Sequence, residues 1–249
     1  MIQGMASTPN PASKLLHVRP VRPLHFPHSE PEEEHLGQHP RHEDLCMFLK
    51  LILRSIVGPE HAVSADMFVY WMATVNDDRG RRAPDAALKL GLPQAKMYEH
   101  GAWKTWELGV PELVVEILSL SDTRERWTLQ EKREAYETMG VAEFVCFDLD
   151  APEGRRIRVW DRVEGDFVER VVEGERTPCL TLCRAFGELF EWTIAPAAPW
   201  PLALRVLRGG ALVALPEERA AAAQADADAA RARVAELEAG LAAANRGQD

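Results

Sequence analysis

The stretch Pro111–Gly140, PELVVEILSLSDTRERWTLQEKREAYETMG, decides how this chain folds. It opens with an apolar run rich in β-branched residues, Leu113–Leu118, which is short enough to be a buried strand. Glu116 interrupts this run and points to the same face as Val114, because side chains alternate along a strand. A buried carboxylate without a partner is costly, so Glu116 needs a cation, a hydrogen-bond network or contact with water.

A helix is predicted directly after this strand. Thr128 and Glu131 have the spacing of a capping box, and Gly140 supplies the C-terminal stop. Lys132 falls on the apolar stripe of this helix, which is the face that turns inward. Three interpretations stay open: a buried Glu116–Lys132 ion pair, a lysine that reaches solvent along its stem, or a functional site.

The composition indicates a globular protein with a core, because 46% of the 249 residues are hydrophobic. The net charge of −10 argues against a dedicated high-affinity nucleic-acid binder, whose binding surface is usually basic. It does not exclude a metal-dependent enzyme that touches nucleic acid through a local patch.

The cysteines and the hydrophobic runs indicate a reduced, cytoplasmic protein that does not enter the membrane. Cys179 and Cys183 lack the second pair or nearby histidines of a zinc site, and Cys46 and Cys146 lie in apolar runs. No apolar run reaches membrane-spanning length, and the N-terminus lacks the apolar core of a signal peptide.

The chain divides into four parts by composition. We expect a disordered leader, a folded domain, a linker that can hold a short hairpin, and a C-terminal Ala/Glu-rich helix. These parts cover residues 1–39, 40–195, 196–216 and 217–249. Bulky apolar residues are sparse along the last part, so we expect a solvated helix or a weak coiled coil that could pair two copies into a homodimer.

The order of the expected helices and strands predicts a mixed α/β domain, with a central sheet flanked by helices. The helices are expected at residues 41–57 and 128–139. The sheet is expected to hold the strands 67–72, 84–90, 112–118 and 143–148, and a hairpin follows at 157–160 and 167–172.

Four motifs, in one order, resemble the Uma-two family of restriction-endonuclease-like proteins, which is placed in the PD-(D/E)XK nuclease superfamily. The similarity runs from about Pro40 to Arg184, and the tail from Pro216 also resembles the Ala/Glu-rich helix of many members. The motifs are APDAA at 83–87, VPELVVEILS at 110–119, EKREAY at 131–136 and GVAEF at 140–144.

The resemblance implies a site residue by residue. Asp85 and Glu116 would be the metal-binding acids, and Lys132 would be the catalytic lysine. The superfamily usually has its lysine two residues after the glutamate, where this chain has Leu118. In this family the lysine lies on the following helix instead, which agrees with the inward-facing Lys132.

The chain also departs from the family pattern. Relatives commonly have Pro-Asp before the central strand, whereas this chain has Pro111-Glu112, and the usual Ser-Pro after the strand is Ser119-Leu120. The acid that the superfamily carries on its first helix has no clear match, and Glu43 is the candidate, with His42 as the weaker one.

The resemblance implies a metal-dependent endonuclease that hydrolyses phosphodiester bonds in nucleic acid, with DNA as the expected substrate. The cofactor would be Mg²⁺, with Mn²⁺ as a substitute, because carboxylates are the ligands that such hard cations prefer. The alternative is an inactive nuclease fold that acts as a binding or scaffold protein through its C-terminal helix. We expect Asp85, Glu116 and Lys132 to converge in a cleft open to solvent.

Overall fold

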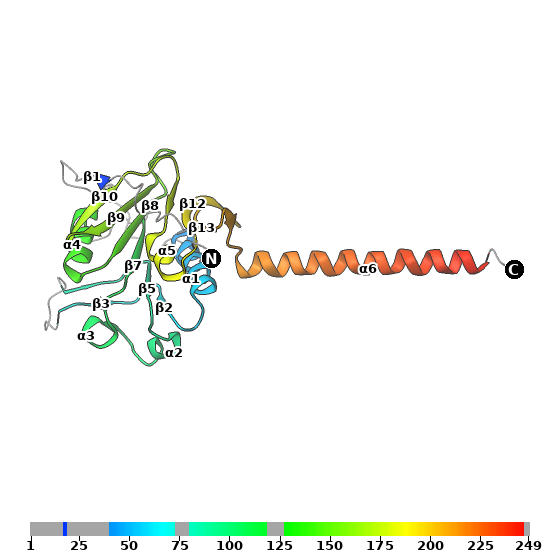
Figure 1. Ribbon diagram of the computed structural model, residues 1–249, viewed down its shortest axis with the longest axis horizontal. Helices are drawn as coiled ribbons and strands as arrows, with labels where there is room; N and C mark the ends of the chain where they lie inside the picture. The colour runs from blue at the N-terminus through cyan, green and yellow to red at the C-terminus, as the bar shows by residue number, and fades with distance from the viewer. Residues whose placement is uncertain (1–16, 19–39, 73–79, 119–126, 247–249) are drawn as a thin grey trace, which may run out of the picture. The chain divides into compact units, whose positions relative to one another are not determined.

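Strands β7 and β8 form the middle of the largest sheet in the computed structural model, which describes residues 17–18, 40–72, 80–118 and 127–246 (Figure 1). This sheet has seven strands in the order β1-β10-β9-β8-β7-β5-β2. Their bounds are His17–Val18, Asp166–Arg170, Ile157–Val163, Glu143–Asp148, Leu113–Leu118, Ala86–Lys89 and Ala62–Ser64. The predicted mixed α/β sheet is therefore confirmed.

The pairing of the central strands explains why a helix stands between them in sequence. β7 and β8 are parallel, and the other neighbouring strands of this sheet are antiparallel. Parallel strands need a crossover, and here α4 (Leu129–Met139) supplies it. The helix begins with the predicted capping box between Thr128 and Glu131, and it ends at Gly140, whose φ of 97° suits glycine.

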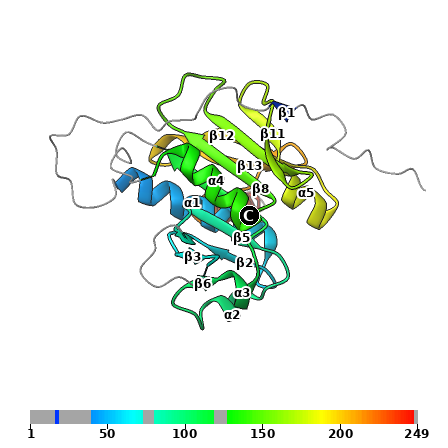
Figure 2. The same cartoon turned by 90° about the vertical axis from the view of Figure 1, so that its left-hand side faces the viewer.

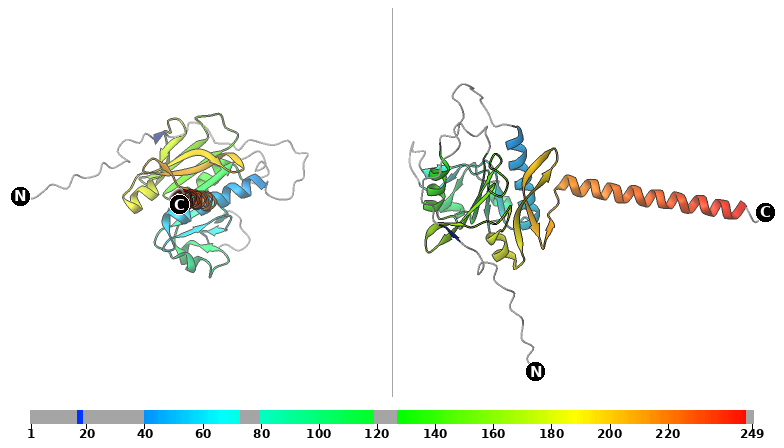
Figure 3. Two further views of the ribbon diagram at one scale, coloured as in Figure 1. Left: turned by 90° about the vertical axis from the view of Figure 1, so that its right-hand side faces the viewer. Right: turned by 90° about the horizontal axis from the view of Figure 1, so that it is seen from above.

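Helices cover both faces of the seven-stranded sheet. α4 lies on one face and α1 (Pro40–Val57) lies on the other (Figure 2). α1 contacts β2, β5 and β7 of the sheet, and on its far side it contacts β13 (Trp200–Arg208) (Figure 3). α1 thus lies inside the domain, which explains why its apolar face is buried.

The core on the α4 side is built around aromatic side chains. Phe144 on β8 stacks on Trp160 of β9 and packs against Tyr136 of α4. Val114 and Leu118 of β7 belong to the same buried cluster. Glu116 lies between these two residues on β7, so its carboxylate is directed into this apolar layer.

The prediction of a strand at 67–72 in the central sheet is wrong. Only Val69–Tyr70 is a strand (β3), and it pairs with β4 (Arg81–Arg82) and β6 (Trp103–Lys104) in a separate three-stranded sheet. Asp66 has a φ of 56°, which turns the chain away before β3 begins. The edge of the central sheet is formed instead by β2, which is too short to give a sequence pattern.

A further sheet begins within the expected domain and extends into residues 196–216, where a linker with a possible short hairpin was expected. It has the strand order β11-β12-β13-β14. The side chain of Trp200 on β13 donates a hydrogen bond to Asp44 of α1 at 2.8 Å, which ties this sheet to the helix. The new strands are β11 (Arg176–Pro178), β12 (Phe190–Ala197) and β14 (Ala211–Leu212), and the remaining short helices are α2 (Gln94–Met97), α3 (Thr105–Leu108) and α5 (Leu180–Phe186).

The chain divides into two compact units, of residues 1–213 and 214–249. The second unit is the helix α6 (Pro216–Arg246), whose residues 217–240 are all exposed. The expected disordered leader lies outside the described residues, except for His17–Val18, which pair with β10. None of the described helices is long and apolar enough to span a membrane.

Candidate active site

Asp85 lies immediately before β5 and is held by two hydrogen bonds. The backbone N–H of Ile117 on β7 donates to Oδ2 at 2.6 Å, and Nε2 of His42 on α1 donates to Oδ1 at 3.0 Å. Burial alone would raise the pKa of this carboxyl. The hydrogen bond and charge of His42, the charge of Lys132 and the Ile117 N–H outweigh burial, so the pKa of Asp85 lies below its usual value.

Glu116 is held by two residues of α4. Lys132 Nζ donates to Oε2 at 2.6 Å, and the hydroxyl of Tyr136 donates to Oε1. Lys132 and Tyr136 are four residues apart, so both project from the same side of the helix. The carboxylate therefore has a cationic partner and a neutral partner, which offsets the cost of burying it.

The three residues predicted from the sequence are brought together at one end of the sheet. β5 and β7 are antiparallel neighbours with Ala86 opposite Val115, so continuing this register by one residue places Asp85 opposite Glu116. Lys132 is close enough to Asp85 for its charge to lower the pKa of that carboxyl. The fold therefore brings Asp85, which the family resemblance implied, to the same end of the sheet as Glu116 and Lys132.

The structure differs from the expected open cleft, because the side chains of Asp85, Glu116 and Lys132 are buried. The exposed fraction is 1% for Glu116, 4% for Lys132 and 6% for Asp85. The apolar layer under α4 and the packing of α1 on the sheet cover them from both sides. The site therefore has its charged groups in place, but a substrate could reach them only after the surrounding residues move.

Of the two candidates for the site residue on the first helix, only His42 lies near Asp85. His42 is 3% exposed and contacts Asp85, whereas Glu43 is exposed at the surface of α1. One turn further on, Cys46 is buried beside His42, and burial raises the pKa of its thiol to about 12 although a hydrogen bond from His42 opposes this. One potential ligand atom from each of His42, Cys46 and Asp85 lies within 4.8 Å of the other two.

Tyr136 and Cys46 were not among the site residues predicted from the sequence. Tyr136 stands four residues after Lys132, and this spacing is the signal that both side chains could share one partner. Cys46 was interpreted as a small hydrophobe, although it stands four residues after His42. The contact of Asp85 with the Ile117 backbone had no sequence signal, because a main-chain donor has no residue signature.

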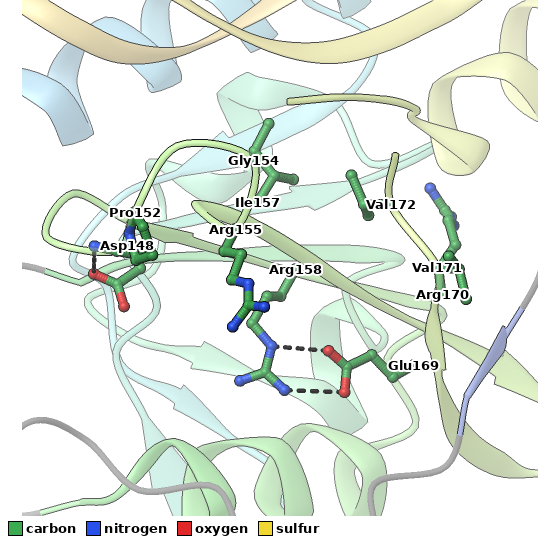
Figure 4. Close-up of a pocket in the computed structure, with 11 residues that line it drawn as sticks. Asp148, Pro152, Gly154, Arg155, Ile157, Arg158, Glu169, Arg170, Val171 and Val172 are labelled. Carbon is green, nitrogen blue, oxygen red and sulfur yellow. Dashed lines mark hydrogen bonds and ion pairs between the residues drawn. The ribbon is translucent and has the colours of Figure 1, made fainter. Parts of the chain in front are cut away.

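A cavity of about 580 Å³ lies where β8 ends and β9 begins, at the same end of the sheet (Figure 4). On its wall, Arg158 forms two hydrogen bonds with Glu169, at 2.8 and 2.9 Å. Arg155 also lines this cavity, and its side chain is exposed (Figure 4). Guanidinium groups are well suited to contact phosphate. None of the site residues Asp85, Glu116 and Lys132 lines this cavity.

Comparison with known proteins gives a family. The model of the Uma2 family, described as "Putative restriction endonuclease", matches residues 32–195. The chain is also similar to a solved structure described as a "putative nuclease belonging to DUF820" from Anabaena variabilis, with 13% identity and a TM-score of 0.42, over 61% of this chain and 78% of that one. No curated protein matches the chain.

Proposed function

This chain belongs to the Uma2 family, and on that premise we propose that it is a divalent-metal-dependent endonuclease that hydrolyses phosphodiester bonds in DNA. The observation that carries the proposal is the convergence of Asp85, Glu116 and Lys132 at one end of the strands β5 and β7. Two acids from neighbouring strands, with a lysine from α4 paired to one of them, are groups that can carry metal-assisted phosphodiester hydrolysis. We place this activity in residues 40–195.

The donor set fits a hard divalent cation. Asp85 and Glu116 present carboxylate oxygens, which are the ligands that Mg²⁺ prefers, and Mn²⁺ accepts the same ligands. These two side chains would therefore hold the ion. When bound, a divalent cation supplies Lewis acidity to the scissile phosphate and to the attacking water.

The surrounding residues hold these acids in position. The Ile117 N–H and His42 fix the orientation of Asp85, and the Tyr136 hydroxyl fixes that of Glu116. Such partners set the direction and basicity of ligating groups. Lys132 is the cation of the site, and we assign it to the stabilisation of negative charge that develops on the phosphate oxygens.

The DNA strand would pass along the end of the sheet where β7 and β8 end. Arg155 is exposed there, on the rim of the cavity shown in Figure 4. A local arginine is enough to contact a phosphate in a chain whose net charge is −10.

We propose that α6 joins two chains into a homodimer, because Val234 and Leu237 are half-exposed apolar residues on one helix.

The test is nicking of supercoiled plasmid DNA by the full chain with Mg²⁺, with Mn²⁺, and with a chelator. Cleavage should require the metal, and Glu116→Gln should reduce it by at least about 100-fold, because a charged metal ligand is replaced by a neutral amide. Glu188→Gln is the matched control, since Glu188 is paired with Arg208 in another sheet and lines neither the site nor the cavity shown in Figure 4.

The rival function is an inactive nuclease fold that serves as a binding or scaffold protein. The near-complete burial of Asp85, Glu116 and Lys132 is the observation that favours it. A parent protein that binds DNA but cleaves neither single- nor double-stranded DNA with any of these metals would support this rival and contradict the nuclease proposal.

A further inference from the structure

Three different donor types meet on the α1 side of Asp85. His42 and Cys46 are four residues apart on α1, so their side chains leave the helix on the same side. Asp85 reaches them from the loop before β5, and one potential ligand atom of each residue lies within 4.8 Å of the others. Across the described part of the chain, no other three His, Cys, Asp or Glu residues meet this way.

The Asp85 carboxylate is already oriented for this cluster. The Ile117 N–H holds Oδ2 at 2.6 Å, and this leaves Oδ1 directed at His42, 3.0 Å from Nε2. A hydrogen bond on the second oxygen of a ligating carboxylate is the usual outer-shell support of a metal ligand. The support comes from the backbone of a central strand, so it does not depend on a mobile side chain.

The distances require only a small adjustment. Zinc bonds to nitrogen and oxygen are about 2.0–2.2 Å and those to sulfur about 2.3 Å, so tetrahedral donors lie about 3.3–3.8 Å apart. Donor atoms at the upper limit of 4.8 Å would have to approach by about 1 Å to bind one ion. Oδ1 of Asp85 and Nε2 of His42 are already as close as two ligands of one ion.

The donor set selects a class of metal. Imidazole and thiolate ligands suit Zn²⁺ and its neighbours in the transition series, whereas Mg²⁺ takes hard oxygen ligands. Three protein ligands also leave a fourth position, which is the arrangement of catalytic zinc sites.

We propose that His42, Cys46 and Asp85 bind one transition-metal cation of the Zn²⁺ class. The site shares Asp85 with the proposed nuclease centre, and it would make that carboxylate a ligand of a softer ion than Mg²⁺. Metal binding itself is what the proposal asserts, so it stands or fails apart from nuclease activity.

The competing explanation is packing. Free cysteine is often buried as a small hydrophobe, and a His–Asp pair can satisfy its own buried polar groups. Under this explanation the three residues are neighbours that bind no ion, and substitution of Cys46 would leave the metal content of the protein unchanged.

The experiment is spectroscopic and uses the full chain refolded with Co²⁺ as the probe. A thiolate ligand gives a sulfur-to-cobalt charge-transfer band in the near ultraviolet, and tetrahedral coordination gives intense visible bands. The expected stoichiometry is about one cobalt per chain, displaced by Zn²⁺ but not by a large excess of Mg²⁺.

Two cysteine variants separate this site from other thiols. Cys46→Ser should abolish the charge-transfer band and weaken cobalt binding by more than the roughly 10–100-fold typical of an outer-shell change. Cys183→Ser is the matched control, because Cys183 is also buried but hydrogen-bonds to Phe190 instead. Cys46→Ala serves if the serine variant does not fold, as judged by circular dichroism.

A charge-transfer band that disappears in Cys46→Ser or Cys46→Ala and persists in Cys183→Ser supports the site. No band in the parent, or a band that survives loss of Cys46, overturns it. A protein that cleaves DNA with Mg²⁺ but shows no band refutes this site and supports the proposed function. A protein that shows the band but does not cleave DNA supports this site and contradicts the proposed function.

Discussion

At the residue scale, the identity of the charged groups could be predicted but their exposure could not. Glu116 within an apolar strand and Lys132 on an inward helix stripe indicate that the two meet, and they do, at 2.6 Å. Whether the pair faces water depends on how α1, α4 and the sheet close around it, which is a property of the tertiary packing. Of the partners of Asp85, His42 was predicted only as the weaker first-helix candidate, and the Ile117 N–H has no sequence signal.

Lys132→Met is the substitution that tests the burial of this pair. Without metal, we expect it to lower the free energy of unfolding by about 3–5 kcal/mol, because the buried Glu116 carboxylate loses its cationic partner. Saturating divalent metal should restore part of this loss if the carboxylate is a metal ligand. Urea unfolding with and without Mn²⁺ measures both effects.

The matched control is Lys89→Met. Lys89 pairs with Glu112 just before the same strand, but both side chains are partly exposed, so the loss should stay near 1 kcal/mol or below and should not respond to metal. Equal losses for the two lysine variants would show that the Glu116–Lys132 pair is not buried as described.

Asp85 gives a prediction about pH. Its pKa is lower in the folded protein than the unfolded value of about 3.9, so the unfolded state binds the proton more tightly. Asp85 therefore contributes stability that is fully present above about pH 5 and is lost as the pH falls through the folded pKa. Asp85→Asn should flatten the acid limb of a plot of unfolding free energy against pH. An unchanged acid limb would contradict this assignment.

At the element scale, long and strongly patterned segments were predicted well and short ones were not. The strand before Ser119, the helix from Leu129 and its capping box follow from hydrophobic period and cap residues, and each is present. β3 was assigned to the wrong sheet, because β-branched and aromatic content marks a strand but not its partner. The three residues of β2 carry too little pattern to be recognised.

The capping box of α4 is expected to matter for both stability and function. Thr128→Ala removes the side-chain acceptor of the Glu131 N–H and should cost about 1 kcal/mol in unfolding free energy. Because Lys132 lies in the first turn after the cap, fraying there should also reduce cleavage more than it reduces DNA binding. Thr138→Ala, at an exposed position of the same helix, should change stability by about 0.5 kcal/mol or less.

The stability measurement is denaturant unfolding, and the functional measurement is plasmid nicking beside a DNA-binding assay. If Thr128→Ala and Thr138→Ala behave alike in both, the cap does not position Lys132.

At the scale of the whole molecule, the division into a folded unit and a helical tail was visible in composition. Alanine and charged residues dominate after Pro216, and residues 217–240 of α6 are exposed. The end of the folded unit was harder to place, because β13 lies where a linker was expected. Only packing against α1 shows that β13 belongs to the domain.

Removal of residues 217–249 should therefore leave the thermal midpoint of the remaining unit within about 1–2 °C of the parent, because surface changes rarely exceed about 0.5 kcal/mol in a protein of this size. The removed helix exposes Val234 and Leu237, so if it pairs two chains the parent alone should show a concentration-dependent molecular mass in sedimentation. Calorimetry of parent and truncated protein at two concentrations measures the midpoints. A fall of about 5 °C or more at high dilution, where pairing is absent, would mean that α6 contributes to the stability of the folded unit itself.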